Sequence, residues 1–175
     1  INNGRLALAL TVDDNRYMGL DSISLLDFEN GWEITNSPMS FMPLGKLRMP
    51  ETSAAGDVSH GGKKHLISFK HDGPGSRVLE AHMDNFGPGG AITAHIELFD
   101  EPDESMVICT PFDKPGHFYY NQKIHCMRAK GEVVYDGKTY VFDPSDSFAV
   151  LDWGRGVWTY HNTWYWGSAS GQVDG

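Results

Sequence analysis

Hydrophobic and polar residues alternate along much of this chain with a period of two. In residues 91–99, Ile92, Ala94, Ile96 and Leu98 fall on one side of an extended chain, with polar residues between them. Successive side chains of a β-strand point to opposite faces, so this pattern predicts a strand with one buried face. Similar runs recur between Gly, Pro, Asn and Asp residues. The predicted strands are residues 5–12, 22–28, 65–70, 77–83, 91–99, 104–110, 117–128, 132–135, 138–142 and 148–153.

Short turn sequences connect these strands. Asp136-Gly137 is typical of a tight hairpin turn of the primed type, and residues 113–116 predict a second hairpin. Residues 36–62 contain prolines, paired glycines and little periodicity, so we expect a long loop there. Hairpins in succession, without a helix, predict an all-β fold: an antiparallel up-and-down barrel or a strongly curved sheet. We expect a single β domain over residues 1–175, and a start without methionine suggests part of a longer chain.

The segment 151–171 (LDWGRGVWTYHNTWYWGSASG) is unusually rich in aromatic residues. Trp158, Tyr160, Trp164 and Trp166 occupy even positions, so in a strand they share one face with Asn162. A helix would distribute the rings around its axis. We therefore expect a strand whose rings fill the core or line a cavity. The predicted ligand-binding residues are Trp153, Arg155, Trp158, Tyr160, His161, Asn162, Trp164 and Trp166.

Two of these residues, Arg155 and His161, could each have one of two roles. Arg155, between two glycines, could present its guanidinium to a carboxylate ligand, but we favour a β-bulge with Arg155 paired to Asp152 or another acid. His161 could exchange a proton with a ligand or be an ordinary surface residue. Tyr119, Asn121, Lys123 and His125 also share a strand face, as do His95 and Glu97, and the pattern leaves open whether these faces point inward or outward.

The composition of the chain makes some classes of binding partner unfavourable. The chain has 23 acidic and 14 basic residues and a formal net charge of −9, which disfavours nucleic acid and anionic lipid surfaces. No apolar run is long enough to span a bilayer as a helix. Cys109 and Cys126 form no CxxC pair, so we expect free thiols, which favours the cytoplasm.

Motifs for several kinds of chemistry are missing. The sequence contains no Gly-x-Ser-x-Gly elbow and no P-loop, and we expect no cofactor. The eight histidines lack the spacing of a structural zinc site, so we expect no metal. His60 and His65, with Asp57 nearby, are expected to be solvated residues in or beside a loop.

Three segments carry a resemblance to a known family. Residues 104–112 (ESMVICTPF), 117–133 (HFYYNQKIHCMRAKGEV) and 151–171 resemble the domain of unknown function numbered 2804. The match includes the Pro-Phe pair, Phe-Tyr-Tyr-x-x-Lys, a turn at Gly131 and Asp-Trp-Gly-Arg-Gly. That family is distantly similar to carotenoid hydratases of the hydroxyneurosporene synthase type, which have two consecutive lipocalin-like barrels. The resemblance implies a lipocalin-like β-barrel with an apolar pocket and a longer parent chain, and it transfers no catalytic residue.

Three functions follow as hypotheses. The favoured one is a lipocalin-like domain that binds a hydrophobic small molecule, an isoprenoid or lipid, with hydration, cyclisation or isomerisation as the reactions it could catalyse. The first alternative is a carbohydrate-binding or carbohydrate-active β-sandwich. The second is a structural or interaction domain without a small ligand, which associates with itself or with the rest of a longer chain.

Overall fold

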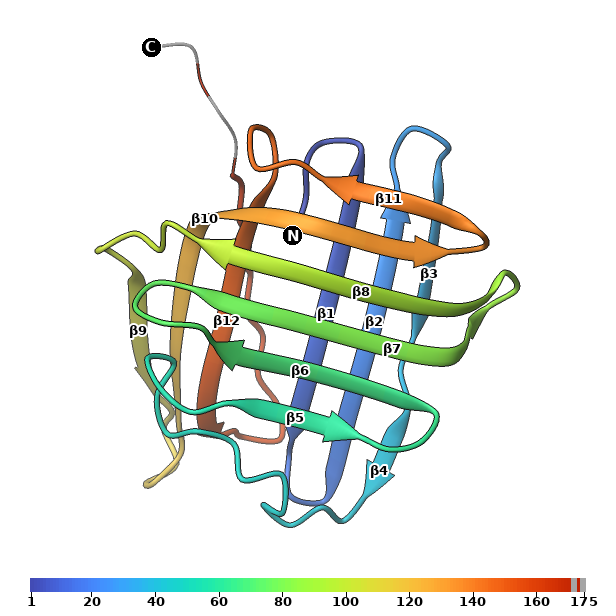
Figure 1. Ribbon diagram of the computed structural model, residues 1–175. Helices are drawn as coiled ribbons and strands as arrows, with labels where there is room; N and C mark the ends of the chain where they lie inside the picture. Colours follow the sequence, from blue (N-terminus) through green and yellow to red (C-terminus); the bar gives the residue numbers. More distant parts are fainter. Residues whose placement is uncertain (171–172, 174–175) are drawn as a thin grey trace.

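The computed structural model describes residues 1–170 and 173, and in them it contains antiparallel β-strands and no helix. Figure 1 shows two layers whose strands cross at a steep angle. The strands of the rear layer stand upright in that view, and the second of them pairs antiparallel with the first, the third and the fourth. The four strands of this sheet are β1 (Leu6–Asp14), β2 (Met18–Asp27), β3 (Trp32–Asn36) and β4 (Met39–Phe41).

The front layer runs across them in Figure 1, in the strand order β11-β10-β8-β7-β6-β5. Two further strands, β9 and β12, pair with the first half of β10 and extend its sheet toward the rear. The strands of this second sheet are β5 (Val58–Gly61), β6 (His65–His71), β7 (Arg77–Gly87), β8 (Gly90–Phe99), β9 (Met106–Pro111), β10 (Phe118–Tyr135), β11 (Lys138–Phe142) and β12 (Phe148–Val157).

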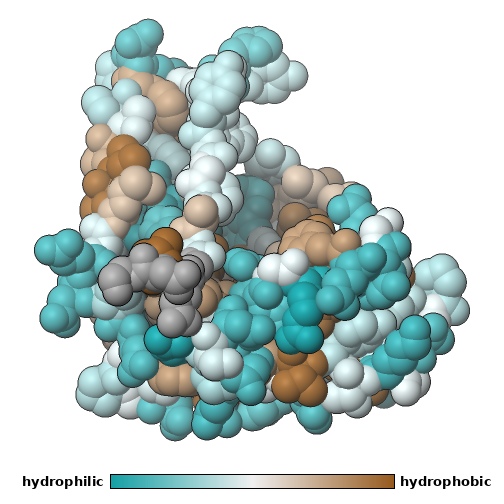
Figure 2. Space-filling view, turned by 90° about the horizontal axis from the view of Figure 1, so that it is seen from above, coloured by the Kyte–Doolittle hydropathy of each residue, from teal (hydrophilic) through white to brown (hydrophobic). Residues whose placement is uncertain are grey.

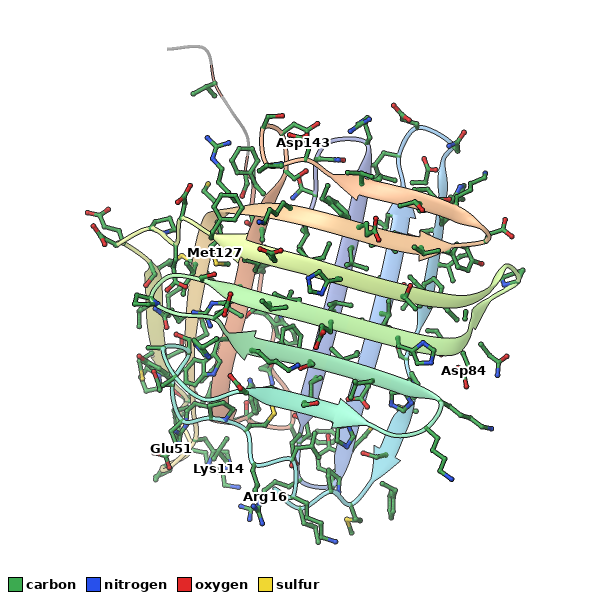
Figure 3. The ribbon with its side chains drawn as sticks, in the orientation of Figure 1. Arg16, Glu51, Asp84, Lys114, Met127 and Asp143 are labelled. Atoms are coloured by element: carbon green, nitrogen blue, oxygen red, sulfur yellow. The ribbon has the colours of Figure 1, made fainter. Side chains whose placement is uncertain are left out.

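The long strand β10 turns from one layer into the other. Its first half pairs with β9 and β12, and its second half pairs with β8 and β11. The register with β12 shifts between Ile124 and Met127, and Cys126 has a positive φ of 58°. A β-bulge of this kind bends a strand and increases its twist. Figure 3 labels Met127 at the left, where β10 turns.

The core lies between the two layers and is built by the predicted alternation. Ile92, Ala94, Ile96 and Leu98 of β8 are all buried, as predicted, and Leu6 and Leu8 of β1 face them from the rear layer. The polar residues between them, including His95, lie on the outer face. Figure 2 shows that the molecule is hollowed when seen from above, with hydrophobic side chains at the surface beside the hollow.

The all-β, antiparallel prediction is confirmed, and of its two forms the structure has the strongly curved sheet. Among the described residues the two sheets meet at one isolated bridge, where Asn2 and Phe148 exchange backbone hydrogen bonds of 2.8 and 2.9 Å. The Asp136-Gly137 turn is also confirmed, because both residues have the positive φ values, 51° and 68°, that a type I′ turn requires. No helix of the described chain has the length and apolar character needed to cross a membrane.

Some predicted boundaries were wrong. Residues 117–128 and 132–135 belong to one continuous strand, with Gly131 inside it rather than in a turn. The segment 36–62 is not all loop, because it contains β4 and β5. These two strands have three and four residues, too few to show a clear period.

Candidate functional site

A cavity of about 390 Å³ lies between β1, β12 and the front layer. Consecutive residues 8–12 of β1 and 149–153 of β12 line it, so it reaches between the edges of these two strands. Because the described parts of β1 and β12 are joined only near the Asn2–Phe148 bridge, their edges leave room for the cavity. Its apolar walls include Leu8, Leu10, Val12, Phe69, Leu79, Leu98 and Leu151.

One part of the cavity wall is polar. Arg77, 9% exposed, donates through Nε and Nη2 to Glu101 Oε2 at 3.2 and 2.8 Å. Its Nη1 donates to the Ser53 carbonyl at 3.0 Å and lies 2.9 Å from His71 Nε2. A guanidinium has no lone pair to offer, so His71 Nε2 is the acceptor of this bond. The arginine therefore brings a charge into the wall and has it neutralised there by Glu101.

The loop between β4 and β5 closes one side of the cavity through Met49, Pro50, Thr52, Ser53 and Gly56. The Arg77 bond to the Ser53 carbonyl holds it to β7, and the Ser53 hydroxyl donates to Gln122 of β10. Arg155 Nη1 reaches the Glu51 carbonyl at 3.4 Å, and Figure 3 labels Glu51 at the lower left of the molecule. The loop is thus fastened to three different strands.

The opposite face of β10 and β12 carries a buried cation. Lys123 is 3% exposed and its ammonium donates to Asp152, which lies directly across from it in the antiparallel pair. The ring of Trp166 lies 5.7 Å from Lys123 Nζ, a cation–π distance. Asn121, two residues before Lys123, is 5% exposed, and its Oδ1 is buried without a hydrogen-bond partner in the described part of the chain. The polar face 119–125 of this strand is therefore buried at Asn121 and Lys123, but it does not line the cavity.

The two glycines of the Asp-Trp-Gly-Arg-Gly segment allow close approach to β10. A Cβ on Gly154 would lie 2.9 Å from the Tyr119 ring, and one on Gly156 would lie 2.4 Å from the Phe118 carbonyl oxygen. The ring of Tyr119 is thereby free to lie against Trp158, with centroids 5.4 Å apart. The glycines leave room for a neighbouring ring and backbone. The predicted β-bulge was wrong, because the register with β10 is continuous through residues 154–156. The predicted pairing of Arg155 with Asp152 or another acid was also wrong in the described chain, because Asp152 bonds Lys123 and Arg155 reaches the Glu51 carbonyl.

A family model described as "Domain of unknown function (DUF2804)" matches residues 1–175. The chain belongs to this family. No curated protein and no solved structure matches the chain. The family is thus confirmed over the whole sequence, including the three segments that carried the resemblance.

Among the predicted site residues, Trp153 lines the cavity and Arg155 holds its loop. The predicted strand geometry of residues 158–166 was wrong, because β12 ends at Val157 and this tail has no strand structure. The rings do not share one buried face: Trp158, Tyr160, Trp164 and Trp166 are 43%, 95%, 73% and 50% exposed. His161 is exposed against the Tyr160 ring, and Asn162 donates to the Thr159 carbonyl. None of these six tail residues lines the cavity.

The polar wall of the cavity was not among the sequence predictions. Arg77 stands at the start of a run in which Leu79, Ala81 and Met83 alternate as buried residues, so the pattern places an arginine on the apolar face. Such an arginine requires buried partners, and this signal was present in the sequence. His71 and Glu101, its partners, lie just outside the predicted strands 65–70 and 91–99 and carry no comparable signal.

The expectation of solvated loop histidines at positions 60 and 65 was also wrong. His60 Nδ1 and His65 Nε2, on β5 and β6, lie 2.7 and 2.8 Å from Oδ2 of Asp21 on β2. Asp21 is 3% exposed, so its carboxylate joins the two layers from a buried position. Within residues 1–170 and 173, no group of three or more His, Cys, Asp or Glu side chains has the arrangement of a metal site.

Proposed function

We propose that the cavity binds a small hydrophobic molecule of the isoprenoid or lipid class. The observation that carries the proposal is a space of about 390 Å³ with mainly aliphatic walls and a few polar groups on one side. Binding pockets for small molecules have this character and occupy about 300–1,000 Å³. An apolar pocket is also what the sequence resemblance to lipocalin-like carotenoid hydratases implies.

The polar wall favours an uncharged ligand. The positive charge of Arg77 is already neutralised by Glu101 at 2.8 Å, so it attracts an anion only weakly. An ionised ligand carboxylate would enter without a free counter-charge from this residue, which is unfavourable in an apolar cavity. The net charge of −9 opposes an anion as well. An alcohol or carbonyl compound with a long apolar chain therefore fits better than a fatty acid.

Retinol and retinoic acid provide the test, because they share a polyene chain and differ in the end group. We expect saturable fluorescence enhancement of retinol with the wild-type protein and at least tenfold weaker binding of retinoate. Leu10→Trp fills the cavity and is expected to abolish retinol binding. Leu66→Trp is the matched control, because Leu66 is 39% exposed on β6 and does not line the cavity.

Thermal unfolding of each variant shows whether it is folded. If Leu10→Trp does not fold, Val12→Phe replaces it as the variant that fills the cavity, because Val12 also lines the wall. Retinol that fails to bind the wild-type protein, or that binds Leu10→Trp and Val12→Phe as well as Leu66→Trp, refutes the proposal. Retinoate that binds as tightly as retinol overturns the preference for an uncharged ligand.

A further inference from the structure

Strand β9 (Met106–Pro111) is an exposed sheet edge with an apolar sequence. It pairs with β10 on one side, and no other strand of the described chain pairs with it. All six of its residues are exposed, and Met106, Val107 and Ile108 are 42%, 50% and 43% exposed. Apolar side chains therefore lie at the surface on both faces of this strand. Exposed apolar edges of this kind are sites where another strand can add.

Backbone hydrogen bonding shows which groups face outward. Phe112 donates its N–H to the His117 carbonyl at 3.0 Å, so residues 112 and 117 form a hydrogen-bonded pair. Such pairs alternate along an antiparallel ladder, so residues 106, 108 and 110 bond to β10. The N–H and C=O groups of Val107 and Cys109 then point to the open edge. Pro111 offers a carbonyl there and no N–H.

We propose that β9 pairs antiparallel with β9 of a second copy of this chain and joins the two sheets into one. The strand has no charged residue between Met106 and Pro111, whereas natural edge strands are commonly blunted by charge or by a bulge. Antiparallel pairing of two identical strands is related by a two-fold axis, so the same surface serves both partners. A single self-complementary strand therefore suffices for a closed dimer.

The outward backbone groups select the register. When Cys109 lies opposite its own copy, residues whose numbers sum to 218 face each other, and all three outward residues of each strand, 107, 109 and 111, are paired. A shift by one residue would oppose these outward groups to residues that already bond to β10, so it allows no ladder. In the selected register the Val107 N–H also meets the Pro111 carbonyl, the one bonding group that proline retains.

Sedimentation equilibrium of the wild-type chain is the first test, and we expect a dimer that dissociates on dilution. Val107→Lys places a charge at the centre of the edge and is expected to give a monomer. Val141→Lys is the matched control, because Val141 is 54% exposed on β11, away from β9, and the dimer should persist. A wild-type monomer at high micromolar concentration, or a Val107→Lys variant that remains dimeric, overturns the proposal.

Cysteine cross-linking tests the register. Directly opposed residues in antiparallel strands have Cα atoms about 4.5–5.5 Å apart, which suits a disulfide. Mild oxidation should therefore link the wild-type chains through Cys109. Cys109→Ser is expected to abolish the link and Cys126→Ser to retain it, although both thiols are exposed. A link that forms equally through Cys126 would show random collision and contradict the assigned register.

Discussion

We predict that the two partners of the buried Lys123–Asp152 ion pair differ in how much their substitution changes the free energy of unfolding. Lys123 is 3% exposed, whereas the side chain of Asp152 is 52% exposed. Removing the carboxylate leaves a buried ammonium without its counter-charge, but removing the ammonium leaves a carboxylate that water already reaches. Asp152→Asn should therefore reduce the free energy of unfolding much more than Lys123→Met, which keeps the length and apolar contacts of the lysine stem.

The magnitude follows from the burial of each group. Loss of one partner from a buried ion pair costs about 3–5 kcal/mol, and the exposure of Asp152 moves the estimate for Asp152→Asn to about 2–3 kcal/mol. Replacement of buried charges by apolar residues is often neutral or stabilising, so Lys123→Met should change stability by no more than about 1 kcal/mol. With a urea m-value of about 2 kcal/mol/M, Asp152→Asn lowers the midpoint by roughly 1–1.5 M.

Urea unfolding monitored by circular dichroism measures both variants. Glu97→Gln is the control, because the Lys130–Glu97 pair, 2.8 Å apart, has both side chains close to half exposed. An exposed pair of this kind contributes about 0–1 kcal/mol. If Asp152→Asn costs no more than Glu97→Gln, or if Lys123→Met costs as much as Asp152→Asn, the reasoning about the buried cation is refuted.

Two further predictions concern a strand interior and a turn. Gly131 has φ of +143°, and a Cβ there would lie 2.1 Å from the His95 carbonyl oxygen. Gly131→Ala should therefore lower the thermal midpoint far more than Gly137→Ala, because a Cβ at Gly137 would lie in open space. Equal effects of the two substitutions would contradict the assigned packing. Hydrogen bonds from the Asn30 side chain and backbone lower the pKa of Asp27, so this carboxylate stabilises the fold above its ordinary pKa and the contribution is lost as pH falls through the lowered pKa. Asn30→Ala should therefore be less stable than wild type at neutral pH and converge with it in acid, and a stability difference that is constant with pH would show that the bond does not act through ionisation.

The alternation of residues predicted the fold class because burial in this protein follows strand pairing. Ile96, for example, is fully buried between its polar neighbours, and its period-two setting was visible in the sequence. The cavity was less accessible to prediction, since it depends on the separation of β1 and β12, which are far apart in the sequence. Trp153 was predicted to contact a ligand, and Arg77, polar within an apolar series, was the signal of the polar part of the wall.

Residues 158–166 show that alternation of residue types is not enough to predict a strand. Trp158, Trp164 and Trp166 have the spacing of a strand face, but a strand also requires a neighbour for its backbone hydrogen bonds. Within residues 1–170 and 173, β10 already has β9 and β12 on its two sides over this region, and no strand pairs with residues 158–166. Thr159 and Asn162 form short-range bonds to backbone carbonyls there instead.

The Asp-Trp-Gly-Arg-Gly segment connects the cavity with the buried cation because it lies on one strand between them. Trp153 and Asp152 of β12 both line the cavity and Arg155 reaches its loop, while the Asp152 carboxylate bonds Lys123. The glycines stand on the side of Asp152, where Tyr119 and the backbone of Phe118 approach. Substitution of either glycine would therefore disturb the Lys123 face first and the cavity only through movement of the strand. The five residues form one unit because Asp152 belongs both to the cavity lining and to the Lys123 ion pair.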